Sequence, residues 1–141
     1  MKDQKQQPYV YESDYERRFF EWAGLTVVEA GNGRARVRLD IEPHHRGGGG
    51  TEAINGGIGA YMFDGVLGTA VRTTWDEGVA GQVTMSLNIQ YLRPLIGDDT
   101  VMAYGEVTHR GRQSVFVRGE IYDREGRAAM AATGLFHLFR R

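Results

Sequence analysis

One carboxylate stands in an almost wholly apolar stretch, residues 55–71, where its presence needs a chemical reason. The stretch reads as a single helix that opens on Gly56 and Gly57 and carries one acid, Asp64. A carboxylate resists burial unless it is paired, hydrogen-bonded or neutralised. The preceding loop, residues 46–54, is so rich in glycine that its backbone can approach a ligand closely. We therefore take a glycine-lined helix start, two turns from a buried acid, as the candidate active site.

The chain has 141 residues and no cysteine, which limits both its size and its chemistry. This length suits one domain with a real core, which we expect over residues 11-141 after a flexible N-terminus at 1-10. A net charge of -1 argues against a general nucleic-acid binder. The lack of cysteine excludes disulfides, a thiol nucleophile and cysteine-based metal sites. Because no signal-like or membrane-spanning segment is evident, we expect a soluble cytoplasmic protein without a membrane partner.

The elements that must position this site begin with a short helix. Ser13 is a suitable cap for a helix over residues 14–23, and Gly24 a suitable end. One face of that helix is aromatic, since three side chains recur at helical spacing: Tyr15, Phe19 and Trp22. We expect this face to pack in the core or at an interface rather than to bind a ligand.

A β-hairpin follows, with arms at residues 26–30 and 34–41. In the second arm, apolar and charged residues alternate, which is typical of a half-buried strand. The inward set is Ala35, Val37, Leu39 and Ile41. The outward set includes Arg34, Arg36 and Arg38, which could hold phosphates, although a solvated sheet face is the favoured interpretation.

Four further strand patterns come after the central stretch, at residues 83–92, 100–108, 113–122 and 128–139. In the first of them an apolar set alternates with polar residues: Met85, Leu87, Ile89 and Tyr91. The apolar faces need a cover, and only the helix at 56–72 is apolar enough. We predict an α+β domain, a curved antiparallel sheet of five to six strands wrapped around one long central helix, plus the short N-terminal helix. One helix cannot cover both sheet faces, so the other face is either an oligomer interface or polar and wet.

Several of these segments together resemble a known family. Asn55-Gly56-Gly57 and, further on, Phe63-Asp64 are similar to a motif of the hotdog-fold acyl-CoA thioesterases, in particular the phenylacetate-pathway (PaaI-like) type. The segment 83–94, which ends in Tyr-Leu-Arg-Pro, is similar to a strand of the same family. The resemblance covers roughly residues 12 to 139. It implies the hotdog fold, a hydrolase that acts on acyl-CoA, and no cofactor, because coenzyme A is part of the substrate.

The resemblance also implies roles for individual residues. Thioester hydrolysis requires an activated water or a nucleophile, and a donor for the developing oxyanion. By resemblance Asp64 is the general base or nucleophile, and Thr84 is the strand hydroxyl that orients the water. The backbone N–H of Gly56 polarises the thioester carbonyl, with Gly57 as the neighbouring candidate, because a helix N-terminus has unpaired N–H groups and a positive dipole end.

Asp64 and Gly56 are roughly 12 Å apart along one helix. One subunit is therefore unsuited to offer both groups to one carbonyl. This spacing gives a physical reason for the homodimer with interface active sites that the resemblance implies. A dimer of dimers, and hence a homotetramer, is the expected assembly.

The chain departs from the family motif around this helix start. Asn55 stands where relatives have histidine, and an amide orients a carbonyl but cannot shuttle a proton, so we assign Asn55 to positioning. An upstream Asn or Gln of many relatives is Gly49 here, within an apparent loop insertion. Glu52 or His45 could contribute from that loop instead.

Other polar residues have two interpretations each. Arg93, Arg110 and Arg112 could bind the phosphates of coenzyme A, since arginine suits phosphate geometry, or simply keep the surface soluble. For His44 and His45, solvated loop histidines are favoured over metal ligands, and we expect no metal. Asp64 itself could be a structural acid that is hydrogen-bonded across a dimer interface.

Three functions stay open at this point. The first is an acyl-CoA thioesterase for an aryl or medium-chain acyl group. The second is another hotdog enzyme, a 3-hydroxyacyl hydratase or dehydratase, which the absence of histidine at Asn55 disfavours. The third is a non-catalytic acyl-CoA-binding domain, in which Asp64 would have no evident use.

Overall fold

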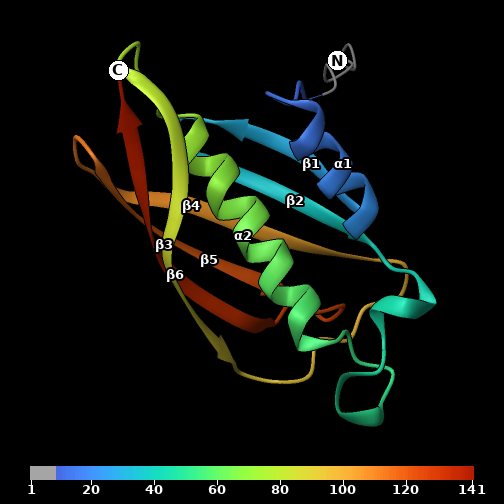
Figure 1. Cartoon of the computed structure of the whole chain (residues 1–141). Helices are drawn as coiled ribbons and strands as arrows, with labels where there is room; N and C mark the ends of the chain where they lie inside the picture. Colours follow the sequence, from blue (N-terminus) through green and yellow to red (C-terminus); the bar gives the residue numbers. More distant parts are fainter. Residues whose placement is uncertain (1–8) are drawn as a thin grey trace, which may run out of the picture.

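A computed structural model describes residues 9–141, so most of the N-terminus predicted to be flexible, residues 1–8, lies outside the described residues. The elements in chain order are α1 (Asp14–Ala23), β1 (Leu25–Gly31), β2 (Arg34–Asp40), α2 (Gly56–Arg72), β3 (Val79–Tyr91), β4 (Thr100–Arg110), β5 (Ser114–Tyr122) and β6 (Ala128–Arg140) (Figure 1). Two short 3-10 turns, Pro43–His45 and Gly48–Gly50, lie between β2 and α2. The predicted α+β arrangement is confirmed.

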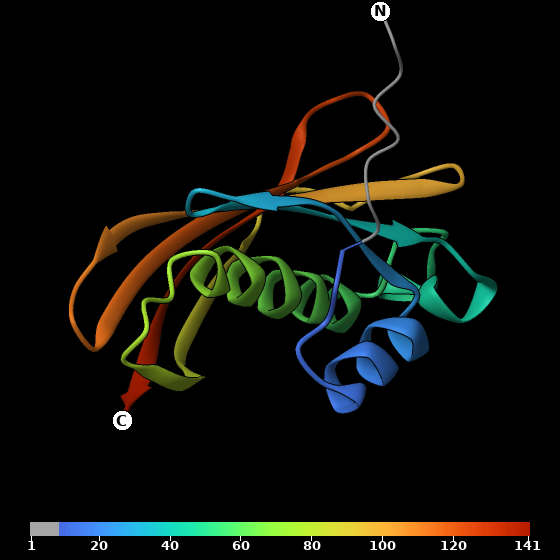
Figure 2. The same ribbon diagram turned by 90° about the horizontal axis from the view of Figure 1, so that it is seen from above.

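The six strands form one antiparallel sheet in the order β1-β2-β4-β5-β6-β3, and the sheet curves around α2 (Figures 1 and 2). The helix covers the concave face because its apolar side chains need that cover. Met62, Phe63, Val66 and Leu67 of α2 are fully buried. Gly59 lets the helix approach β6, since a Cβ there would lie 2.4 Å from Met130 Sδ.

The first helix has the predicted caps but a different buried face. The Ser13 hydroxyl accepts the Glu16 N–H, and Gly24 is left-handed with a φ of 78°. Of the two places predicted for this face, the core is wrong for Tyr15 and Trp22, which are 86% and 68% exposed, and packing at an interface stays a prediction. Phe20 and Ala23 are buried instead. The Phe20 ring packs against Gly65 of α2, which has no side chain there. The first helix, α1, is therefore held on α2 through the face that carries Phe20 and not through the predicted aromatic face.

The edge strand β3 departs from the predicted burial pattern. It begins at Val79 rather than at Val83, and it pairs only with β6. Met85 and Tyr91, which the alternation assigns to the apolar face, are 62% and 56% exposed. A bulge between Thr84 and Ser86 interrupts the alternation, and an edge strand lacks a second neighbour to cover its side chains. The result is a long exposed strand with apolar side chains.

Candidate functional site

Asp64 and Thr84 meet in the structure although they are far apart in sequence. The Thr84 hydroxyl donates a hydrogen bond to Asp64 Oδ1 over 2.8 Å. Asp64 is exposed in the single chain, so the expectation of a buried acid is wrong for the isolated subunit. The reason is geometric: α2 turns Met62 and Phe63 into the core and Asp64 toward the edge strand β3. Within residues 9–141 no other side chain bonds to this carboxylate, which leaves Oδ2 free for a reactant.

A cavity of about 460 Å³ begins at this pair and runs along α2. In Figure 1, β3 and α1 flank α2, and side chains of both elements line this cavity. Its apolar lining comes from Phe19, Phe20, Val83 and Phe136, and Gly65 and Gly68 contribute bare helix backbone to it. An apolar cavity with a carboxylate at one end is suited to a small-molecule substrate.

The start of α2 is the second half of the predicted site. The Asn55 side-chain oxygen accepts the Gly57 N–H over 2.9 Å, so Asn55 is the N-cap of the helix. The Gly57 N–H is therefore engaged, which weakens Gly57 as a donor to a substrate. Among the described residues the Gly56 N–H has no hydrogen-bond partner, so Gly56 is the better candidate.

Tyr91 is a residue that the sequence reasoning missed. Its hydroxyl donates to the Gly56 carbonyl over 2.9 Å, and a Cβ on Gly56 would lie 3.1 Å from the Tyr91 ring. The only sequence signal was its place in the Tyr-Leu-Arg-Pro segment. Since Thr84 contacts Asp64 and Tyr91 contacts Gly56, strand β3 touches both halves of the site.

Replacing Tyr91 with Phe should lower kcat/KM for the proposed reaction roughly two- to tenfold, the effect of one neutral hydrogen bond. The lost bond loosens the Gly56 peptide without opening a cavity, so the melting temperature should hardly change. Tyr15→Phe is a matched control, because Tyr15 is exposed on α1. Equal kinetics in the two variants would show that the Tyr91 hydroxyl does not position Gly56.

Arg46 anchors the glycine-rich loop, and Glu52 of this loop lies away from the reactive pair. The Arg46 guanidinium donates to the carbonyls of Glu52, Gly97 and Asp98 over 3.1, 3.3 and 2.8 Å. The Glu52 side chain is exposed, and the structure does not bring it to the Asp64–Thr84 pair. Gly49, with a φ of 61°, offers no side chain in place of the amide of relatives.

His45 is buried, being 1% exposed, so the expectation of a solvated loop histidine is wrong for it. Its Nδ1 accepts the Glu42 N–H over 2.9 Å, and its carbonyl accepts the Asn55 N–H over 2.8 Å. The ring lies against Gly24, where a Cβ would be 2.9 Å from Cε1. His45 therefore supports the Asn55 cap instead of entering the reaction. Within residues 9–141 no group of three His, Asp or Glu side chains could hold a metal.

Burial, with His44 nearby, lowers the pKa of His45 below its ordinary value of 6.5. The folded state prefers the neutral ring, so this contribution to stability is present above pH 6.5 and is lost as pH falls through the lowered pKa. We expect the melting temperature to fall on acidification, with a smaller slope in His45→Gln. His44→Gln, an exposed neighbour, should keep most of the wild-type slope. Identical slopes in all three proteins would contradict this account.

The three candidate arginines do not form one phosphate site. Arg93 is exposed, donates to the Ala128 carbonyl over 3.2 Å, and follows two residues after Tyr91, whose hydroxyl bonds to Gly56 at the start of α2. Arg110 lies beyond the other end of α2, bonded to Thr74 Oγ1 and to Asp76 over 3.2 Å each. Arg140 also holds Asp76 and lowers the pKa of that carboxyl to about 2. Arg112 is exposed on the turn after Arg110. Of the three candidate arginines, only Arg93 therefore lies on the side of the site that contains Gly56.

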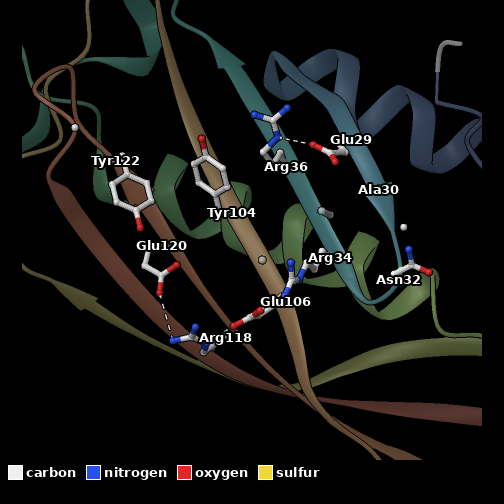
Figure 3. A pocket seen from close by; sticks show the side chains of 14 residues that line it. Glu29, Ala30, Asn32, Arg34, Arg36, Tyr104, Glu106, Arg118, Glu120 and Tyr122 are labelled. Carbon is white, nitrogen blue, oxygen red and sulfur yellow. Dashed lines mark hydrogen bonds and ion pairs between the residues drawn. The ribbon is translucent and has the colours of Figure 1, made fainter. Parts of the chain in front are cut away.

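The outer face of the sheet carries a shallow hollow lined by charged and tyrosine side chains (Figure 3). Each outward-facing arginine of β2 has a carboxylate partner: Arg36 bonds Glu29 at 2.9 Å, Arg34 faces Glu106 at 3.7 Å, and Arg38 bonds Asp40 at 3.0 Å. These pairs favour a solvated sheet face over a phosphate site.

Comparison with known proteins adds the family context. Residues 52–130 match the thioesterase superfamily. A Halobacterium salinarum protein named "putative esterase" is 33% identical over 126 residues, covering 83% of this chain and 82% of that protein. The structure of a Bacillus halodurans protein with CoA is 28% identical, with a TM-score of 0.77, over 92% of this chain and 83% of that one.

The Escherichia coli PaaI protein from the phenylacetic acid degradation operon is 20% identical, with a TM-score of 0.75 over 87% of this chain and 89% of that one. This similarity concerns the fold. It confirms the hotdog architecture and the resemblance to PaaI-like proteins that the sequence motifs indicated.

Proposed function

The chain belongs to the thioesterase superfamily, and from this premise we propose that it hydrolyses acyl-CoA thioesters to the free acid and coenzyme A. The observation that carries the proposal is the Thr84–Asp64 hydrogen bond of 2.8 Å at one end of an apolar cavity. The CoA in the related Bacillus halodurans structure supports coenzyme A as the carrier.

In the proposed reaction, Asp64 takes a proton from water as the water oxygen attacks the thioester carbon, or attacks that carbon itself. The Thr84 hydroxyl holds one carboxylate oxygen, so the other points to the reactant. The Gly56 N–H at the helix start stabilises the oxyanion, helped by the positive end of the helix dipole. Collapse of the oxyanion breaks the C–S bond and releases the coenzyme A thiolate, which takes up a proton. If Asp64 attacks, this leaves an acyl–Asp64 anhydride, which water then hydrolyses to the free acid and the Asp64 carboxylate.

We place the complete site between two copies of the chain. Strand β3 is an exposed edge with apolar side chains, a surface that favours pairing with a second strand. Thr84 marks the Asp64 half of the site and Tyr91 the Gly56 half. In an antiparallel β3 pair whose two-fold axis passes between Leu87 and Asn88, Thr84 faces Tyr91 of the partner subunit. Each such dimer then assembles two sites from complementary halves.

The acyl group occupies the cavity between α1 and β3 in this proposal. Aromatic side chains at Phe19, Phe20 and Phe136 suit an aryl or medium-chain acyl group. Coenzyme A then extends toward the partner's helix start, where Arg93 is the available cation.

Thiol release from a panel of aryl- and medium-chain acyl-CoAs tests the proposed hydrolysis directly. Turnover of at least one member is expected. Tight acyl-CoA binding without thiol release would favour the non-catalytic binding domain, and hydration of an enoyl-CoA would favour the hydratase. Light scattering after size separation tests the assembly: a dimer or a homotetramer fits the shared site, and an active monomer contradicts it.

A further inference from the structure

Arg72, Trp75 and Gln82 line the far end of the cavity beside Asp64. Together with Glu12 they form a chain of side-chain contacts, which we call the crossbar. Arg72 forms an ion pair with Glu12, and its guanidinium lies 3.8 Å from the centre of the Trp75 ring. Trp75 Nε1 donates to Gln82 Oε1 over 2.8 Å. The crossbar therefore joins the segment before α1 to β3, across the end of α2.

The crossbar is anchored to the helix that forms the cavity floor. Gln82 Nε2 donates to the Gly68 carbonyl over 2.9 Å, so the amide cannot rotate freely. Glu16 lines the same cavity, and its carboxylate accepts the Glu12 N–H over 3.1 Å. A methyl end that reached this region would have to displace hydrogen-bonded and charged groups, which is costly.

Between the reactive end and the crossbar, the helix surface that lines the cavity carries no side chain at Gly68. Asp64, Gly68 and Arg72 recur at four-residue spacing on one face of α2, and the middle one has no side chain. The helix rise puts the Asp64 and Arg72 backbones roughly 12 Å apart. An acyl chain that starts at Asp64 can thus lie over Gly68 and must stop at Arg72.

We propose that the Arg72 crossbar sets the maximum length of the acyl group that the chain accepts. The inference rests on the proposed acyl-CoA hydrolysis and assigns its chain-length limit to a defined set of side chains. Below the limit, each added methylene should raise kcat/KM about fourfold, because it buries one more apolar group. At the limit the rise should end.

Straight-chain acyl-CoAs of increasing length test this limit in wild type and Arg72→Ala. The chain length with the highest kcat/KM should move to longer acyl groups in the variant, which opens the space over Trp75. Arg118→Ala is the matched control, since Arg118 pairs with Glu106 on the outer sheet face, and its profile should equal that of wild type. An Arg72→Ala profile that also equals wild type overturns the proposal.

Gly68→Ala tests the limit from the opposite direction. A Cβ there lies 3.4 Å from Gln82 Nε2 and 3.6 Å from Phe136, so the fold accommodates it and helix propensity favours it. The preferred acyl length should become shorter. An unchanged preference, with the protein folded, counts against an acyl path over Gly68.

Binding of non-hydrolysable acyl-CoA thioethers, measured by calorimetry, separates this inference from the proposed hydrolysis. Absence of thiol release from every acyl-CoA contradicts the hydrolysis alone. In that case the affinities of the thioether series still measure the maximum acyl length. This maximum should lie at longer chains in Arg72→Ala than in wild type. Equal chain-length dependence of binding in the two proteins overturns the crossbar as the limit.

Discussion

Asp64→Asn should lower kcat/KM for acyl-CoA hydrolysis at least ~100-fold, the usual scale for a lost acid–base group. The amide is isosteric with the carboxylate and can still accept the Thr84 hydroxyl bond. It can neither take up a proton nor attack the thioester. The fold should be unaffected, because Asp64 is exposed in the single chain. The core contacts of α2 come from other residues, such as Met62 and Phe63, which the substitution leaves in place. Steady-state thiol release and the melting temperature measure the two quantities separately.

Asp14→Asn provides the control for this substitution. Asp14 is also an exposed helical aspartate, on α1, where it forms an ion pair with Arg17. Its variant should retain wild-type turnover. If Asp64→Asn behaved in the same way, Asp64 would be a structural acid, and the assignment of the reaction to this carboxylate would be wrong.

The central helix was predictable to its last residue because its limits are local. Asn55 caps it, a glycine pair opens it, and its apolar pattern ends at Arg72. The burial of β3 was not predictable in the same way. Whether Met85 is covered depends on which strand lies beside it, and the sheet order places only β6 there. Local pattern thus predicts an element, while its exposure follows from its neighbours.

The candidate site shows the same division. The Asp64–Thr84 pair was expected only through the family resemblance, since nothing in the spacing of two residues on different elements requires contact. The contact of Tyr91 with Gly56 was not predictable from the sequence, because it depends on how the edge strand β3 lies along α2. His45 was misjudged because a histidine in a polar loop gives no sign that the end of α1 will cover it.

Co-expression of two inactive variants should restore activity if each site uses two chains. One chain carries Asp64→Asn. The other carries Gly56→Val, whose side chain would push into the Tyr91 ring, 3.1 Å from the added Cβ, and obstruct the oxyanion donor. In an isolated heterodimer, one site contains both substitutions and the other contains neither. The heterodimer should therefore retain about half of the wild-type activity, while each homodimer is nearly inactive.

This restoration distinguishes a shared site from a site within one chain. If Asp64 and Gly56 of the same chain served one carbonyl, every site of the heterodimer would contain a substitution and activity would stay at the level of the homodimers. The separation of roughly 12 Å along α2 argues against that arrangement. Differently tagged chains allow the heterodimer to be purified before its thiol-release rate is measured. A rate no higher than that of the two homodimers would refute the pairing of β3 strands that brings Thr84 opposite Tyr91 of the partner subunit.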